Sequence, residues 1–287
     1  MTQAVEQRGP RRPPGRAAPF VRHLFLVSLA VAGLFPFYYL FVNSLKDRLA
    51  FAQNQLSVPS DLVWSNYAKA WDALAKPVFN SIVVVGVSVV LILALSALAS
   101  YAFAILRFPG WRAVYWLVFV LLLIPSFLLL LPLYLQITRL PVKGGYLSII
   151  LPTVAAALAF SIVVLKSFFE QIPQELLDAA RVDGAGDLTI FWRIVVPLSR
   201  PVLTSVAIIQ CVALWNDYLL PQLVLDPAYR TVSVAMVAFT ANPGQASAPD
   251  YGAIMAGYVV SAVPLVILFA FMMRAYIDGL TSGAGKL

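Results

Sequence analysis

The side chains best suited to specific chemistry gather in one polar segment, residues 166–200, which lies between two long apolar runs. Small residues accompany its carboxylates, because Ala179 and Ala180 follow directly after Asp178. A helix with a small apolar centre and an acidic rim can lie in a groove on a partner protein. The segment therefore predicts a docking site for another protein. Five of the thirteen acidic residues of the chain fall in it: Glu170, Glu175, Asp178, Asp183 and Asp187.

Few residues elsewhere are suited to catalysis or metal binding. The chain has one His, His23, and one Cys, Cys211, so it offers neither a His/Glu metal cluster nor an intrachain disulfide. No Ser/His/Asp set is persuasive. No Gly-x-x-x-x-Gly-Lys-Ser/Thr phosphate loop is present, so the chain cannot hydrolyse ATP alone. We predict a protein that is not itself an enzyme, with no catalytic residues, no metal site and no cofactor.

The polar segment predicts a helix of about ten residues that ends at a sharp turn. Pro173 suits the first helical turn, where its missing N–H costs nothing, and Glu175 lies near the positive end of the helix dipole. Gly184 is the natural stop, since glycine takes the left-handed conformation after a helix without strain. A second short helix is expected over Thr189–Ile194, ending at Val196-Pro197.

The first of these helices should have an apolar stripe and an acidic face. Ile172, Leu176 and Ala180 recur at a spacing of four, and Leu177 broadens the stripe. The alternative to docking is a linker helix that rests on the bilayer, but such helices favour Lys and Arg on their polar face. Because anionic lipid repels an acidic face, docking on a partner protein is favoured.

A second polar pair, Asn216 and Asp217, interrupts an apolar run and is a candidate for a pathway or gating role. Alternatively, Asp217 is solvated near the outer end of its helix, or caps a helix that breaks before Pro221. Helix bends at prolines often line the cavities of transporters. Ordinary packing of kinked helices explains such prolines equally well. The prolines that can bend helices in this way are Pro125, Pro132, Pro152 and Pro264.

The composition places these candidate sites in a membrane protein. Hydrophobic residues make up 61% of the 287 residues, charged residues only 11%, and the mean hydropathy is +0.86. Soluble domains average about 45–50% apolar and about 25% charged residues. The net charge of +7 is spread over short segments without a nucleic-acid motif, so no nucleic-acid partner is expected. Its one local cluster, in the N-terminal tail, suits anionic lipid.

Six long apolar runs predict an all-α polytopic membrane protein with six transmembrane helices and a short cytoplasmic coupling helix between helices four and five. None of the runs alternates with period two, which disfavours a barrel. We expect a disordered basic tail over residues 1–23, a membrane domain over 24–275 and a C-terminal tail over 276–287. The first loop should hold an interfacial helix near Ser65–Leu74, and Asp226–Asp250 should be a loop. The runs are Leu24–Val42, Val78–Leu106, Ala113–Thr138, Gly144–Leu165, Pro201–Leu225 and Tyr251–Met273.

The distribution of basic residues predicts that both termini lie in the cytoplasm. Six spans put the two termini on one side of the membrane, and thirteen of the 20 Lys and Arg residues then fall on that side. Cytoplasmic segments carry an excess of such residues. The polar segment between the fourth and fifth helices is therefore expected to face the cytoplasm.

The polar segment resembles the signature loop of the permease subunits of ABC importers. That pattern is Glu-Ala-Ala, three residues, Gly, nine residues, Ile, one residue and Leu-Pro. Here Asp178 replaces the Glu and is one methylene shorter, Val196 replaces the Leu, and both spacings are kept. Over roughly residues 24–287 the chain resembles the second, six-span permease of carbohydrate (maltose-type) importers. The further matching stretches are 43–46, 80–81, 99–104, 107–110, 124–125, 132–134, 215–217 and 279–286.

The resemblance implies that the polar loop sits in a cleft on a separate ATPase, whose closure on ATP swings the permease from inward-open to outward-open. Asp178 would accept hydrogen bonds from a basic ATPase residue, and Gly184 would make the turn. The tail near Gly283 and Lys286 would also contact the ATPases. The coupling residues implied are Glu175, Asp178, Ala179, Ala180, Asp183, Gly184 and Pro197.

The resemblance also implies the partners and the location. The chain would form half of the translocation pathway of a sugar importer, as a heterodimer with a second permease subunit in a prokaryotic cytoplasmic (inner) membrane. Two ATPase subunits and an extracytoplasmic sugar-binding protein would complete the assembly. Trehalose, maltose-like oligosaccharides and polyols remain open as cargo. The alternatives are an importer for a non-sugar solute such as glycerol phosphate, and an ion-gradient-driven secondary transporter, which would want membrane-centre carboxylates besides Asp217.

Overall fold

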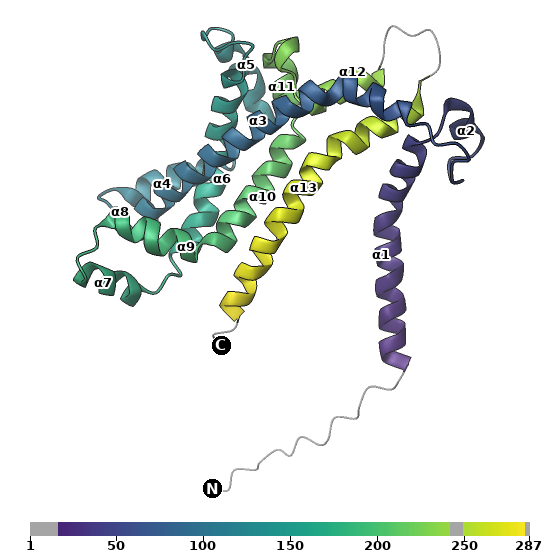
Figure 1. Ribbon diagram of the computed structural model, residues 1–287. Coiled ribbons are helices and arrows are strands. Elements are labelled where there is room, and N and C mark those ends of the chain that lie inside the picture. Colours follow the sequence, from purple (N-terminus) through teal and green to yellow (C-terminus); the bar gives the residue numbers. More distant parts are fainter. Residues whose placement is uncertain (1–16, 242–248, 285–287) are drawn as a thin grey trace.

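The computed structural model describes residues 17–241 and 249–284, which form helices joined by short connections (Figure 1). Among these residues, strand-like pairing is limited to an isolated bridge between Gly144 and Leu225. The fold is therefore nearly all-helical, and the expected all-α class is confirmed.

Within the described ranges, four helices are long and apolar enough to cross a membrane: α1 (Ala17–Ser44), α3 (Ser65–Tyr101), α6 (Leu147–Phe169) and α13 (Tyr251–Ala284). Two further candidates are bent pairs. α4 (Trp111–Leu121) meets the segment Ser126–Ile137 at 90°, and the segment Asp187–Leu198 meets α10 (Arg200–Trp215) at 74°. Counting each pair as one span gives up to six, so several membrane helices are confirmed.

Short helices make up most of the rest. On one side of the bundle lie α2 (Arg48–Gln53), α5 (Leu130–Ile137), α11 (Leu219–Val224) and α12 (Val232–Ala241) (Figure 1). In the chain, η2 (Ser126–Leu129) comes directly before α5, and η4 (Pro227–Tyr229) lies between α11 and α12. The polar segment contains α7 (Gln174–Val182), α8 (Asp187–Ile190), η3 (Phe191–Val195) and α9 (Val196–Leu198). η1 (Ala102–Leu106) is a π-helical end to α3.

α3 corrects the expectation of a short interfacial helix followed by a separate span from Val78. Pro77 stands between the two expected segments, and a proline inside a helix removes one backbone hydrogen bond. The helix instead runs through it, from Ser65 to Tyr101. Leu74 and Val78 lie on either side of the proline and are buried in one cluster with residues of α12. This shared packing face outweighs the local preference.

α12 corrects the expectation that residues 226–250 form only a loop. Ten residues, Val232–Ala241, are helical, and Val232, Val234 and Met236 are buried. The run is too short for a span, and the prolines and glycine around it are typical of a loop. Its helicity depends on packing against α3, which a sequence pattern does not reveal.

The ends of the chain extend further into helices than predicted. α1 begins at Ala17, seven residues before the expected Leu24, and α13 continues to Ala284 through most of the expected tail. The fifth predicted span is also divided, because α10 ends at Trp215 and α11 starts at Leu219. Residues 1–16 and 285–287, which hold much of the two predicted tails, lie outside the described residues.

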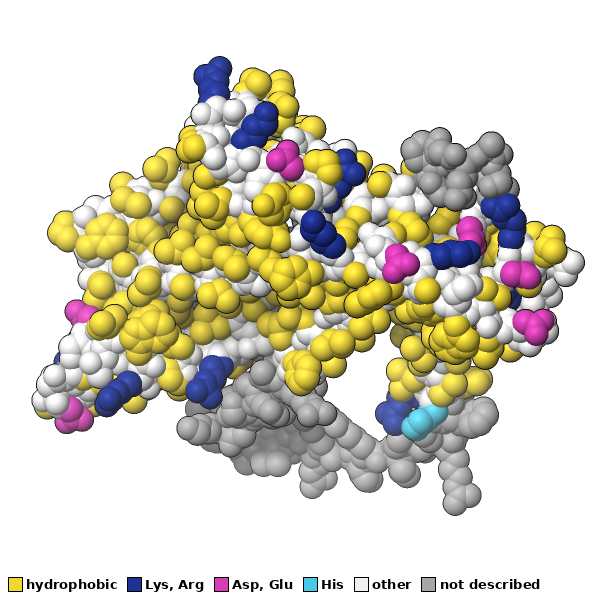
Figure 2. All heavy atoms as spheres, turned by 45° about the horizontal axis from the view of Figure 1, so that its top comes forward, with side chains coloured by type: hydrophobic (Ala, Val, Ile, Leu, Met, Phe, Trp, Pro, Cys, Tyr) yellow, Lys and Arg dark blue, Asp and Glu magenta, His cyan; other side chains and the backbone are white. Residues whose placement is uncertain are grey.

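The arrangement of the elements gives the molecule two distinct ends. α7, α8, the start of α1 and the end of α13 lie at one end, and α2, α5, α11 and α12 lie at the other (Figure 1). Between the ends, the visible face is broadly hydrophobic, with charged side chains mostly at its margins (Figure 2). Such a band suits the hydrocarbon core of a bilayer.

Candidate functional site

The polar segment begins with α7, whose boundaries follow local rules. Pro173 precedes the first turn and Glu175 lies within it. At the other end Gly184 has φ +80°. The N–H of Gly184 donates to the carbonyl of Arg181 at 3.0 Å, and that of Ala185 donates to the carbonyl of Ala180 at 2.9 Å. These two bonds form a Schellman motif, so the predicted helix and its glycine stop are both present.

Leu177 anchors α7 to the body of the protein. Its side chain is 1% exposed and packs in a cluster with Phe169, Ile190 and Val195. Ile172 and Ala180 pack against the same cluster, but Leu176 is 42% exposed. The predicted stripe is therefore corrected: Leu177 is its centre and Leu176 faces outward. Residues three or four positions apart lie on the same face of a helix, so the spacing alone does not decide whether Leu176 or Leu177 points inward. The packing partners of Leu177 decide it.

The outward surface of α7, here called the docking face, combines carboxylates with small and apolar groups. Its exposed members are Glu175, Leu176, Asp178, Ala179, Val182 and Asp183. Val182 is 87% exposed and Leu176 is 42% exposed, so both side chains add apolar surface to the docking face. The sequence analysis missed Val182 and the outward orientation of Leu176. Their signal would have been apolar residues at helix positions opposite Leu177.

Asp178 is held loosely on the docking face. Its carboxylate accepts a hydrogen bond from Arg181 at 2.9 Å and one from Gln174 at 3.3 Å. The Asp178 and Arg181 side chains are 58% and 38% exposed, and exposed pairs of this kind contribute about 0–1 kcal/mol. Asp178 can therefore exchange this intramolecular partner for a cation on another protein.

The second half of the polar segment is fixed more firmly. Ile190 and Val195 are fully buried. The Tyr101 hydroxyl, at the end of α3, donates to the carbonyl of Asp187 at 3.1 Å, and the Tyr101 ring meets Phe191 edge-on at 5.3 Å. Pro197 lies half-buried in α9. The two Tyr101 contacts tie α8 and η3 to the end of α3.

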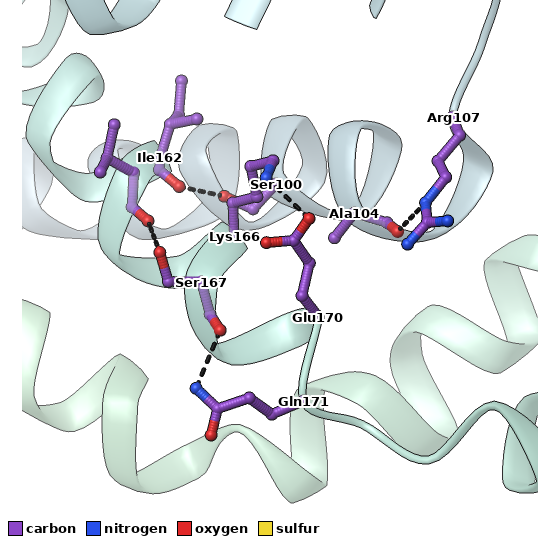
Figure 3. Close-up of polar contacts among 9 residues, drawn as sticks. Ser100, Ala104, Arg107, Ile162, Lys166, Ser167, Glu170 and Gln171 are labelled. Carbon is purple, nitrogen blue, oxygen red and sulfur yellow. Dashed lines mark hydrogen bonds and ion pairs between the residues drawn. The ribbon is translucent and has the colours of Figure 1, made fainter. Parts of the chain in front are cut away.

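A buried lysine, Lys166, lies where the polar segment begins, near the end of α6 (Figure 3). Lys166, near the end of α6, pairs with Glu170 at 2.7 Å, and its ammonium lies 4.3 Å from the ring centre of Tyr115 on α4. Close by, the Ser100 hydroxyl donates to the carbonyl of Ile162 at 3.1 Å, which joins α3 to α6. Three helices therefore meet where the polar segment leaves the bundle.

The structure does not bring Asn216 and Asp217 together with α7, since they follow the far end of α10. Asn216 caps α10, and its side-chain N–H donates to the carbonyl of Val212 at 2.8 Å. Asp217 lies half-buried in the break before α11, near the backbone N–H groups of Tyr218, Leu219 and Leu220. The pathway role of Asp217 and the capping alternative both stay predictions.

The remaining predicted positions give less information. Gly283 lies in the last turn of α13, and Lys286 lies outside the described residues. Within residues 17–241 and 249–284, no group of three or more His, Cys, Asp or Glu side chains is placed to hold a metal ion.

Together, the apolar helices, the broken spans and an exposed acidic helix at one end define a polytopic membrane protein of the transporter class. The chain belongs to the family of binding-protein-dependent transport system inner membrane components, whose family model matches residues 97–281. It is therefore an inner membrane component of such a system.

Relatives of known function agree with this family. The chain is 32% identical to the diacetylchitobiose uptake system permease protein NgcG of Streptomyces coelicolor, over 92% of this chain and 87% of that one. It is 31% identical to the melibiose/raffinose/stachyose import permease protein MelC of Bacillus subtilis, over 92% and 95%. It is also 31% identical to the sn-glycerol-3-phosphate transport system permease protein UgpE of Yersinia enterocolitica, over 90% and 94%.

A solved structure supports the fold. It is a bacterial ABC transporter involved in the import of the acidic polysaccharide alginate, and one of its chains superposes with a TM-score of 0.78. The superposition covers 92% of this chain and 99% of that one, at 21% sequence identity. At this identity the likeness concerns the arrangement of the helices.

Proposed function

We propose that this chain is the sugar-importing permease subunit of an ATP-driven, binding-protein-dependent system, and that it forms half of the translocation pathway. The cargo class is supported by relatives named for diacetylchitobiose and for melibiose, raffinose and stachyose. ATP-driven action through another chain is supported by the absence of a phosphate loop from the sequence.

The coupling role rests on one observation, the docking face of α7. The helix is anchored through Leu177, capped rigidly at Gly184, and presents Asp178, Ala179 and Val182 outward. A basic side chain on an ATPase would replace Arg181 as the partner of Asp178, while Ala179 allows close approach. The remaining proposed coupling residues, Glu175, Ala180, Asp183 and Pro197, would shape the cleft contact or support it. Gly283 and Lys286 would add a contact from the tail.

We further propose a cytoplasmic position for α7 and for both termini, in a membrane domain spanning residues 24–275 with six spans. The start of α1, the end of α13 and α7 lie at the same end of the molecule (Figure 1). The basic excess on these segments favours the cytoplasm for that end. The proposed assembly has a second permease subunit, two ATPase subunits and an extracytoplasmic sugar-binding protein.

The proposal is tested by reconstituting the assembled importer in proteoliposomes with its binding protein. Uptake of a radiolabelled sugar should require ATP on the side of α7 and persist when ionophores collapse all ion gradients. Uptake that follows a proton gradient without ATP would contradict it and favour a secondary transporter.

Glycerol phosphate is a second candidate cargo, because one relative is named for sn-glycerol 3-phosphate. Competition by unlabelled sn-glycerol 3-phosphate in the same assay decides between the two. In a sugar importer, uptake of the radiolabelled sugar should not change when the competitor is added. In a glycerol phosphate importer, the competitor should abolish uptake of the label.

A further inference from the structure

Two broken helices of the bundle meet at one cavity. The first break lies between α4 and α5, beside Ser126, and the second lies between α10 and α11, at Asp217. Both residues line a cavity of about 480 Å³ whose other wall is α6. In transporters, substrate sites typically form where spanning helices are discontinuous, because the breaks leave polar groups free to face a cavity. This volume lies within the range of small-molecule sites, about 300–1,000 Å³.

The polar groups of this cavity are preorganised. Gln210 of α10 is only 6% exposed, and its side-chain N–H donates to the Ser161 hydroxyl of α6 at 3.2 Å. Ser161 in turn donates to the carbonyl of Ala157 at 2.9 Å, so the carboxamide has a fixed orientation. Thr153 lines the same wall and is 8% exposed. Burial of a carboxamide costs free energy unless its polar atoms have hydrogen-bond partners, and Ser161 is such a partner for Gln210.

A second cavity of about 650 Å³ lies alongside, and the two share Ser126 and Pro152. Gln136 is among the residues that line this neighbour. The pair of cavities therefore follows α6 and the first break as one extended polar and apolar space. A solute larger than a single sugar ring can occupy such a space.

The chemistry of the lining selects one class of solute. Among the described residues that line either cavity there is no Lys or Arg, so an anion would find no counter-charge. Asp217 offers acceptor oxygens, Gln210 offers both a donor and an acceptor, and Thr153 offers a hydroxyl. Phe127 and Phe160 add apolar ring surface. Hydroxyl groups that both donate and accept, on a partly apolar ring, match this set.

We propose that this cavity is a solute-recognition site within this subunit, which takes a neutral polyhydroxylated solute during translocation. Gln210 and Asp217 are its specificity-determining residues. The proposal rests on the proposed importer function and adds that this subunit, and not only its partners, distinguishes one cargo from another.

The test compares Asp217→Ala and Gln210→Met with matched controls in the reconstituted importer. Asp72→Ala changes an exposed aspartate of α3, and Gln222→Met changes an exposed glutamine of α11; neither residue lines the cavities. The readouts are the ratio of melibiose to raffinose to maltose uptake, and the ATPase activity that the loaded binding protein stimulates. We expect the two cavity variants to change an uptake ratio by about tenfold, as loss of a buried polar contact does, with stimulated ATPase activity unchanged. The controls should keep both.

The outcomes separate the two proposals. If the wild-type importer shows no ATP-dependent sugar uptake, the importer function fails. If wild type transports sugar but the cavity variants keep its uptake ratios, the recognition site is wrong.

Because Gln210→Met removes the bond to Ser161, Ser161→Ala tests whether that bond alone alters uptake. If a cavity variant fails to assemble, Asp217→Asn and Thr153→Val, which keep the shape of the wall, are measured in its place, and unchanged ratios in both overturn the proposal.

Discussion

Gly184 holds a backbone conformation on which the docking face depends. Its φ of +80° ends α7 and turns the chain toward α8. A β-branched residue pays a steric penalty there, of about 1–2 kcal/mol. Apart from its neighbours in the chain, no atom lies within 4 Å of where a Cβ would stand, so the penalty arises from the backbone conformation. The sequence predicted this residue correctly because helix capping is a local property.

Gly184→Val should therefore uncouple ATP hydrolysis from uptake, with sugar uptake reduced at least about tenfold and the amount of protein in the membrane unchanged. Gly186→Val is the matched control. Gly186 has φ −73° and ψ 162°, an extended conformation that valine adopts readily, and it too has free space around it. Uptake by Gly184→Val equal to that of the control, at equal expression, would contradict the coupling role of the turn.

Lys46 is a buried cation whose burial the sequence analysis did not predict. It has no exposed surface, and its ammonium donates to the carbonyl of Asn54 at 2.9 Å. Burial lowers the pKa of Lys46 below 10.5. The folded state then holds this proton less tightly than the unfolded state does. Stability should consequently rise with pH from the folded pKa up to 10.5 and be lower at more acidic pH.

Lys46→Met should remove this pH dependence. The Tm of the purified protein should rise less in this variant than in wild type as the pH is raised toward 10.5. Lys76→Met, which changes an exposed lysine of α3, should keep the wild-type slope. Parallel curves for wild type and Lys46→Met would show that burial of Lys46 carries no such cost.

At the scale of elements, α4 and α6 are joined by the Lys166 ammonium. It lies 4.3 Å from the centre of the Tyr115 ring, while its pairing with Glu170 stays within the end of α6. Cation–π contacts contribute about 0.5–1 kcal/mol when exposed and about 2 kcal/mol or more when desolvated. Lys166 is buried, so the contact should be near the upper end of that range.

The two side chains should consequently be coupled in a double-mutant cycle. Lys166→Met and Tyr115→Leu should each lower Tm, and the double variant should lower it by less than the sum of the two. Lys143→Met changes an exposed lysine at the other end of the molecule, and its effect should add to that of Tyr115→Leu. Additivity of the Lys166 and Tyr115 variants would mean that the ring and the ammonium do not stabilise each other.

The elements that sequence predicted well are those with local signals. α7 was bounded by Pro173 and Gly184, and the apolar runs Leu24–Val42, Gly144–Leu165 and Tyr251–Met273 became α1, α6 and α13. The errors concern packing. α3 continues through Pro77 because Leu74 and Val78 share one buried face, and α12 forms because it packs on α3. For the same reason the recognition cavity was missed, since Gln210 and Asp217 meet Ser126 only after two spans have broken.

At the scale of the whole molecule, the proposed orientation places α7 and the loop before α3 on opposite sides of the membrane. Val182 on α7 and Ser60 in that loop are both exposed, so each is a suitable site for labelling. The single native thiol, Cys211, is buried on α10 and can be removed by Cys211→Ala. In that background, Val182→Cys and Ser60→Cys each provide one reactive position.

A membrane-impermeant maleimide should label Ser60→Cys in intact spheroplasts and Val182→Cys only in inverted vesicles. The reverse pattern would put the docking face outside and rule out contact with a cytoplasmic ATPase. Co-expression of the ATPase subunits should then slow labelling of Val182→Cys in inverted vesicles by about tenfold, because a docked surface excludes the reagent, and should leave Ser60→Cys unaffected in spheroplasts. Equal labelling of Val182→Cys with and without the ATPase would show that the most exposed apolar side chain of α7 is not covered in the assembly.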